Sequence, residues 1–150
     1  MKTVNAMKTP STYHLMILAV VISSGAIAQS REEVPLFTSR TNGKVFEYAV
    51  DAARAEKQPK WSPSKTPPPL SIADAVGRAD AWIKKRNPRI DTFVPRRIEL
   101  SSILYGEFTG VWYYRISFDG MIDGHRLSAT DFNSVVLLDG SVVEPRPGKW

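Results

Sequence analysis

The sequence predicts an α+β fold, in which one helix packs on a curled antiparallel sheet of four to five strands. The predicted order is one strand, the helix and then four strands (β-α-β-β-β-β). Residues 71–87 have the periodicity of an amphipathic helix, whereas the segments on either side alternate with period two. Glycine- and proline-containing turns separate the alternating segments. A lone helix and a meander of strands must bury their apolar sides against each other, so two layers are expected.

The helix has clear start and stop signals. Ser71 is suited to cap the first turn, and Asp74 three residues later completes a capping box. Three basic residues, 84–86, lie in the last turn, where cations are favoured, and the Asn87-Pro88 pair ends the helix. The apolar residues follow three- and four-residue spacing and form one stripe. They are Ile72, Ala75, Val76, Ala79, Trp82 and Ile83.

Alternating apolar and polar residues predict the strands. Residues 44–51 form the strand before the helix. Three further strands are expected after it: one that begins at Arg96, one at 111–118 and one at 132–138. Asp139-Gly140 is a hairpin signal that leads into a short strand at 141–143. Two kinds of break are also expected. Asp-Gly pairs at 119–120 and 123–124 interrupt the strand before them, and Pro145 and Pro147 end the ordered part.

The first 28 residues resemble a secretory signal peptide. Lys2 and Lys8 give a basic start, residues 15–22 are an unbroken apolar run, and residues 26–28 (Ala-Ile-Ala) fit a cleavage site. The apolar run is shorter than the roughly 20 residues that a helix needs to span a bilayer. We therefore expect a product exported to the periplasm or the extracellular space, without a membrane anchor after cleavage.

The rest of the chain is expected to hold one domain. Residues 29–40 are polar and predict a flexible arm, and residues 41–150 form the domain. Residues 58–69 contain five prolines and predict a stiff connector without helix or strand. Residues 52–57 are alanine-rich and fit either a continuation of the preceding strand or a helical turn.

Composition excludes several classes of function. The formal charge of +5 falls to about +3 when Lys2 and Lys8 leave with the leader, and a balance that mild does not indicate a nucleic-acid partner. The chain has no cysteine, which excludes a thiol nucleophile, a zinc site with cysteine ligands, a disulfide and a lipid-bearing cysteine. An exported domain of this kind depends on its hydrophobic core alone.

No catalytic residue can be assigned from the sequence. His125 is the one histidine after the leader, and a lone imidazole in a loop lacks the nucleophile and orienting group that catalysis requires. Asp119, Asp123 and Asp131 lie near it, but their spacing does not match a calcium loop. No glycine-rich phosphate loop is present. We therefore expect no metal, no cofactor and no enzymatic activity.

The sheet face away from the helix is the better functional candidate. In residues 135–138 both faces are apolar, whereas a strand with one solvated face should alternate. An outward patch of apolar and aromatic residues beside an arginine is typical of a protein interface. The alternative is that the N-terminal arm or the proline-rich segment covers this face. The candidate partner-binding residues are Tyr105, Tyr113, Arg115, Val135 and Leu137.

Three motifs resemble those of PepSY-type domains of exported bacterial proteins, within a cystatin-like architecture. They are residues 70–75 at the start of the helix, 112–116 in the middle strand and 135–143 at the final hairpin, and the resemblance spans residues 70–144. It implies a non-catalytic module that binds a protein or peptide partner or associates with itself. The alternative is a small enzyme or ligand-binding protein with a pocket between the helix and the curled sheet.

Overall fold

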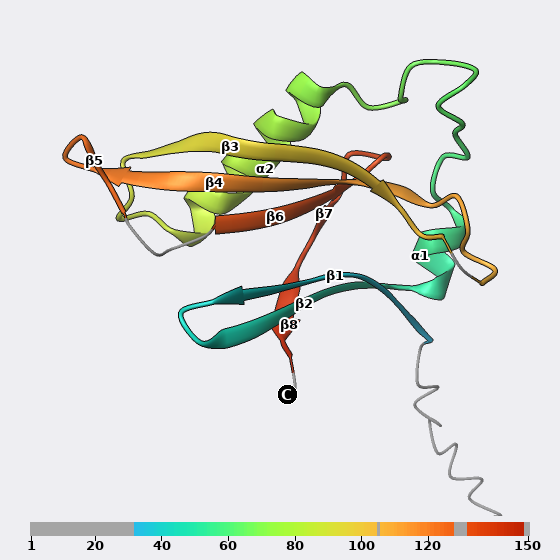
Figure 1. Cartoon of the computed structure of the whole chain (residues 1–150), viewed down its shortest axis with the longest axis horizontal. Coiled ribbons are helices and arrows are strands. Elements are labelled where there is room, and N and C mark those ends of the chain that lie inside the picture. Colours follow the sequence, from blue (N-terminus) through green and yellow to red (C-terminus); the bar gives the residue numbers. More distant parts are fainter. Residues whose placement is uncertain (1–31, 105, 128–131, 149–150) are drawn as a thin grey trace, which may run out of the picture.

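A computed structural model describes residues 32–104, 106–127 and 132–148 (Figure 1). The predicted signal peptide lies outside the described residues. The described part forms eight strands and two helices. In chain order they are β1 (Glu33–Thr41), β2 (Lys44–Asp51), α1 (Ala52–Glu56), α2 (Ile72–Arg86), β3 (Thr92–Ser102), β4 (Trp112–Ile122), β5 (His125–Arg126), β6 (Phe132–Leu137), β7 (Val142–Val143) and β8 (Pro145–Pro147).

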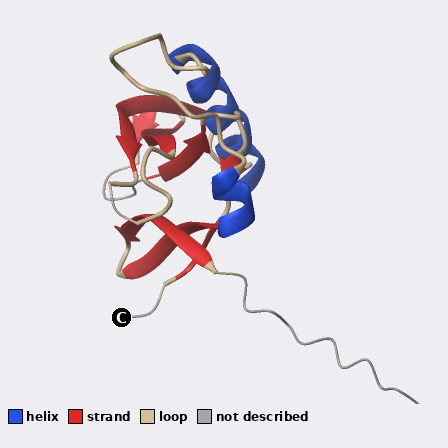
Figure 2. Cartoon of the chain, turned by 90° about the vertical axis from the view of Figure 1, so that its right-hand side faces the viewer, coloured by secondary structure: helices blue, strands red, loops and turns tan. Residues whose placement is uncertain are grey.

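The strands form two antiparallel sheets, so the predicted α+β class is confirmed but the single curled sheet is wrong. Sheet A has the order β1-β2-β8, and sheet B has the order β3-β4-β6-β7, with β5 paired to β4. Figure 2 shows the two sheets stacked one above the other, with the helices along one side. The prediction of one helix is also wrong, because α1 is a second, short helix.

Helix α2 begins and ends where its sequence predicts. The Oγ of Ser71 accepts a hydrogen bond from the backbone N–H of Asp74 at 3.1 Å, and its hydroxyl donates to the Asp74 carboxylate at 2.6 Å. Asn87 closes the other end, where its backbone N–H donates to the carbonyl of Ile83 at 3.0 Å. The buried face consists of small residues and one larger one, which lets the helix lie close to sheet B. These residues are Ala75, Ala79 and Ile83.

Sheet B is covered on both faces, so the molecule has three layers and two cores. One core lies between α2 and sheet B and the other lies between sheet A and sheet B. The core under α2 includes Tyr114, Ile116, Phe118 and Val136. The core under sheet A includes Val34, Tyr48, Val50, Val135 and Leu137.

The predicted flexible arm is wrong over residues 33–40, which belong to strand β1; residues 29–31 lie outside the described part. β1 pairs with β2 across a tight turn in which Asn42 and Gly43 have φ values of 51° and 74°. Both values are positive, as the turn of a two-residue hairpin requires. Val34 is buried in the core under sheet A, and Leu36 and Phe37 pack against the same core, so this segment is held to the domain.

The ambiguous segment after β2 is a helix. The side chain of Asp51 caps α1 by accepting from the N–H of Arg54 at 2.8 Å. Residues 58–69 contain neither helix nor strand, as their prolines predict. Trp61 of this connector packs edge-on against Trp112, with ring centroids 5.0 Å apart. The connector is therefore fastened to the domain.

Gln58 fastens the start of the connector. It is buried, and its side-chain amide donates to the Asp139 carboxylate at 2.9 Å. Ser141 also donates to Asp139, from its backbone N–H at 2.8 Å. The partial burial of Asp139 disfavours its charged form, but hydrogen bonds from Ser141 and Gln58 and the charge of Arg54 outweigh that effect and hold its pKa below the usual value. The β6–β7 turn is thereby tied to the start of the connector.

The expectation that Pro145 and Pro147 end the ordered part is wrong, because they lie in β8 at the edge of sheet A. The backbone N–H of Gly148 donates to the carbonyl of Val45 at 2.9 Å. Successive residues of a strand face opposite sides, so the proline nitrogens at 145 and 147 point away from β2. A strand with this alternation loses no hydrogen bond to its neighbour.

The expected break at Asp119-Gly120 is also wrong. β4 continues to Ile122, and the chain turns at Asp123-Gly124, where φ is 50° and 75°. Gly120 is buried inside β4 for a different reason. A Cβ there would lie 2.8 Å from Cε2 of Phe132 and 3.2 Å from Cδ1 of Leu127. The glycine therefore permits close packing and does not interrupt the strand.

Gly120→Ala should lower the free energy of unfolding by about 1–3 kcal/mol, because the added methyl overpacks a filled site. Equilibrium urea denaturation measures this change. Gly77→Ala is the matched control: nothing lies within 4 Å of a Cβ at this exposed position in α2, and alanine favours the helix there by about 0.5–1 kcal/mol. Equal effects of the two substitutions would contradict the packing argument.

Asp139→Asn should lower the melting temperature at neutral pH, since the hydrogen bonds to Asp139 favour its charged form. A depressed pKa contributes stability above the unfolded-state value of 3.8, and that contribution is lost as the pH falls through the lower folded-state value. The difference from the wild type should therefore shrink below about pH 4. Glu56→Gln, an equivalent neutralisation at an exposed site on α1, serves as the control in calorimetric scans across pH.

Candidate functional site

The predicted partner-binding face is not open in the structure. Tyr113, Val135 and Leu137 are buried in the core under sheet A, and Tyr105 lies outside the described residues. The hydroxyl of Tyr113 donates to the carbonyl of Leu36 in β1 at 2.5 Å. The structure thus realises the alternative reading, in which the N-terminal segment covers this face.

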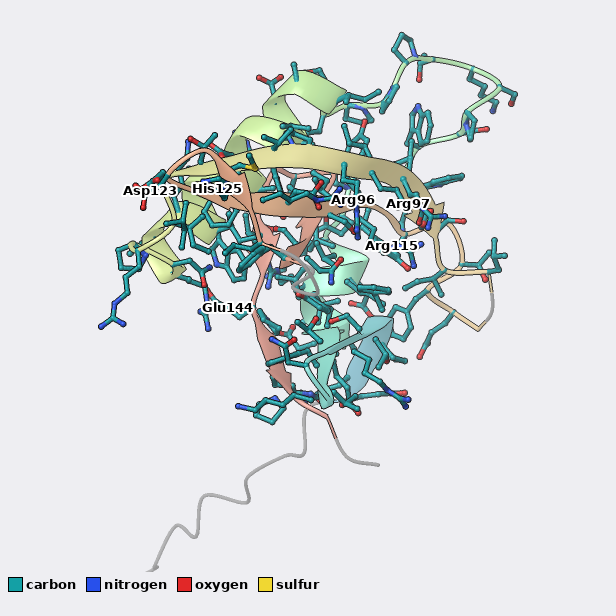
Figure 3. The ribbon with its side chains drawn as sticks, turned by 60° about the vertical axis from the view of Figure 1, so that its left-hand side comes forward. Arg96, Arg97, Arg115, Asp123, His125 and Glu144 are labelled. Carbon is teal, nitrogen blue, oxygen red and sulfur yellow. The ribbon has the colours of Figure 1, made fainter. Side chains whose placement is uncertain are left out.

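Arg115 is half-buried at the border of the covered face. Its guanidinium lies 4.6 Å from the centroid of the Phe37 ring, and it pairs with Glu99 on the adjacent strand. Burial, with the nearby charge of Arg97, lowers the pKa of Arg115. Figure 3 shows Arg97 and Arg115 on the neighbouring strands β3 and β4. Arg115 therefore fastens sheet A to sheet B and is not part of a free patch.

The structure instead has an open cleft of about 340 Å³ between sheet A, the end of α2 and the start of β6. Four aromatic side chains from three elements converge on it: Phe46 and Tyr48 from β2, Trp82 from α2 and Phe132 from β6. The remaining lining residues are mainly polar. They are Ser39, Thr41, Ile83, Arg86, Asn87, Asn133 and Pro145.

Glu144 holds the rim of the cleft. Its carboxylate accepts from the indole N–H of Trp82 at 2.8 Å and pairs with Arg86. The Arg86 guanidinium in turn lies 5.0 Å from the centroid of the Trp82 ring. These three side chains fix one another, so the Trp82 ring is already oriented at the cleft. Such pre-ordering lowers the entropy cost of binding.

Tyr48 forms the floor of the cleft and is buried. Its hydroxyl donates to the backbone carbonyl of Asn133 at 2.9 Å, which links sheet A to sheet B directly. Burial raises the pKa of Tyr48 to about 12, so the phenol is protonated and acts as a donor at neutral pH. The Asn133 side chain accepts from the hydroxyl of Ser117 at 2.7 Å. The polar groups of the floor are therefore engaged within the protein.

Of the three aspartates considered as metal ligands, Asp119 has a structural partner. Asp119 pairs with Arg126 at 2.9 Å, and Asp131 lies outside the described residues. Asp123 and His125 are exposed in and beside the β4–β5 turn, at the end of the sheet away from Arg115 (Figure 3). Within residues 32–104, 106–127 and 132–148 no three His, Cys, Asp or Glu side chains are grouped as a metal site.

Sequence reasoning missed the cleft but not its parts. Phe46 and Tyr48 share one face of the strand predicted at residues 44–51, because that segment alternates with period two, and Trp82 is on the predicted helix stripe. Only the docking of sheet A, which was not predicted, brings them together. The pocket that the alternative reading placed between the helix and the sheet is filled near Tyr114, whose buried hydroxyl donates to the Leu70 carbonyl at 2.8 Å.

Comparison with known proteins finds no family model, no curated protein and no solved structure that matches the chain. The resemblance to PepSY-type and cystatin-like domains therefore remains a prediction. Among the described residues, neither helix has the length and hydropathy to cross a membrane.

Tyr48→Phe should lower the free energy of unfolding by about 1–3 kcal/mol, because it leaves the Asn133 carbonyl without its donor. Glu144→Gln should change it by less than about 1 kcal/mol, since the Glu144–Arg86 pair is exposed. Urea denaturation of the two variants measures both values. The reverse order would show that the rim, and not the floor, holds the two sheets together.

Proposed function

We propose that this protein is a non-enzymatic binding module that holds an apolar side chain of an extended polypeptide partner in the aromatic cleft. The convergence of four aromatic side chains on one solvent-open cleft carries the proposal. Aromatic rings contribute large apolar contact area with little loss of side-chain freedom, which is why they are enriched at binding sites. The occupant that fits best is a proline or aromatic side chain, which stacks on such rings.

The polar groups around the cleft support binding over catalysis. The described lining includes no carboxylate and no imidazole, so it offers no acid–base pair. Tyr48 is kept protonated, and Arg86 is engaged with Glu144. Recognition in such a site depends on shape and apolar contact, with Asn87 at the margin to orient a peptide backbone.

A second candidate is a small apolar ligand in the same cleft. Its volume of about 340 Å³ is at the lower end of the range of small-molecule sites, which is about 300–1,000 Å³. We also propose, from residues 1–28, that the protein acts outside the cytoplasm, and, from the motifs at residues 70–75, 112–116 and 135–143, that it is a module of the PepSY type.

Fluorine NMR of the protein labelled with 5-fluorotryptophan tests the proposal. The probes are N-acetyl-proline amide, N-acetyl-phenylalanine amide and a short peptide that contains both residues. The Trp82 resonance should shift on titration, and the peptide should bind more tightly than either amide. Trp61 packs on Trp112 outside the cleft lining, so its resonance should not move.

Trp82→Leu should reduce peptide affinity by at least about tenfold, given that a central aromatic residue contributes more than 1 kcal/mol to binding. Trp61→Leu is the matched control and should leave affinity unchanged. If the Trp82 resonance stays fixed at millimolar concentrations of every probe, the cleft is not a binding site. Tighter binding of the single amides than of the peptide would favour the small-ligand function.

A further inference from the structure

Strand β3 forms an edge of sheet B and carries unusual apolar exposure. It pairs with β4 on one side, and no other strand of the described chain pairs with it. The most exposed large apolar side chains of the described residues are Ile72 (56 %), Val94 (47 %), Ile98 (40 %) and Leu104 (80 %). Three of these four lie in β3 or two residues beyond it. An edge of this kind is a template for pairing with another chain.

The other edges of the two sheets, within the described residues, have protective features over at least part of their length, and none of their residues is among these four exposed apolar side chains. β1 contains Pro35 and a register shift directly after it, and β8 has prolines at alternate positions. β7 at the far edge of sheet B has two residues. Proline, bulges and short length are the features by which edge strands avoid association.

The edge of β3 is protected in its first half and open in its second. Pro95 and the register shift between Pro95 and Arg97 interrupt regular pairing there. From Arg97 to Ser102 the register with β4 is continuous. This second half therefore presents unpaired backbone groups in regular extended geometry.

We propose that this edge binds β3 of a second copy of the chain, antiparallel, with Ile98 opposite Ile98. In that register Arg97 of each copy lies opposite Glu99 of the other, on both sides of the two-fold axis. Directly opposite side chains in antiparallel strands are about 4.5–5.5 Å apart at Cβ, close enough for an ion pair. Registers centred on Arg97 or on Glu99 place like charges together. The charge pattern thus favours the register centred on Ile98, which forms two ion pairs.

The apolar layer of sheet B also continues across this axis. Ile98 and Leu100 pair with Ile116 and Tyr114 of β4, which belong to the core under α2. Ile98 is at the outer limit of that layer and is 40 % exposed. The two-fold arrangement places it against its own copy and extends the layer through both molecules.

The charged pairs are on the opposite face. Arg97 and Glu99 already pair within the chain, and Arg97 is mainly exposed at 66 %, so it is free to reach across the axis. The contact is short, which predicts a weak dimer whose population depends on concentration. Because the ion pairs are near solvent, salt should weaken the dimer further.

Single cysteines test the register directly, as the chain has no cysteine of its own. Opposite residues in antiparallel strands have Cα atoms about 4.5–5.5 Å apart, within the range that a disulfide bridges. Ile98→Cys should therefore give a disulfide-linked dimer under mild oxidation. Val94→Cys is the matched control, for the two copies of residue 94 would be separated by roughly 26 Å, at about 3.3 Å per residue.

Charge exchange supplies an independent test by analytical ultracentrifugation. Arg97→Glu alone and Glu99→Lys alone should each weaken dimerisation by at least about tenfold, because each puts like charges opposite one another. An equimolar mixture of the two variants should restore it, since both opposite pairs are then complementary. Thermal melts of each variant establish that it is folded.

A monomer at all concentrations up to the millimolar range would overturn the proposal. So would equal cross-linking at residues 94 and 98, or a dimer that both charge variants leave unchanged. A protected β3 edge in a monomer, seen as slow amide exchange at Ile98 and Leu100, would show that another part of the same chain occupies it. The β3 edge shares no residue with the cleft lining, so failure here leaves the binding function standing.

Discussion

The burial of sheet B on both faces is the constraint on which the rest of the structure depends. Successive residues of β6 point to opposite sides, so Val135 and Leu137 enter one core and Val136 enters the other. A strand with no polar face needs a cover on each side. Helix α2 supplies one cover and sheet A supplies the other. The hairpin at residues 33–51 is therefore a structural layer of the domain.

Local physics explains what the sequence predicts well. The extent of α2 follows from the Ser71 cap, a single apolar stripe and Asn87-Pro88, which all act within a few residues. The β1 and β8 strands were not predicted because their stability comes from partners that are distant in the sequence. In β1, Val34 is buried in the core between sheet A and sheet B. In β8, Pro145 and Pro147 are compatible with pairing to β2 only because their nitrogens face away from that strand. Composition alone reads both segments as loops.

The site was predicted less well than the fold, for a related reason. Two apolar faces on one strand fit an exposed interface and a covered core equally well, and only the partner layer decides between them. Tyr113 and Val135 are buried in the core under sheet A, whereas Trp82, on the predicted helix stripe, is partly exposed at an open cleft whose floor is the buried Tyr48. The distinction lies in the packing of sheet A, which leaves an open cleft between its strands and the end of α2.

In a three-layer arrangement both faces of sheet B are covered, so a binding partner is expected to contact the edges and ends of the layers instead. Once α2 and sheet A cover both faces, the described residues still offer two candidate binding surfaces, the cleft at the end of the layers and the open half of β3. These two surfaces differ in chemistry. The cleft has engaged polar groups and partly buried aromatic rings, which suits a side chain, while β3 has open backbone groups and alternating charge, which suits another strand. Because the two surfaces share no residue, a dimer formed through β3 presents two clefts, and a partner with two suitable segments would bind it with higher avidity than a monomer.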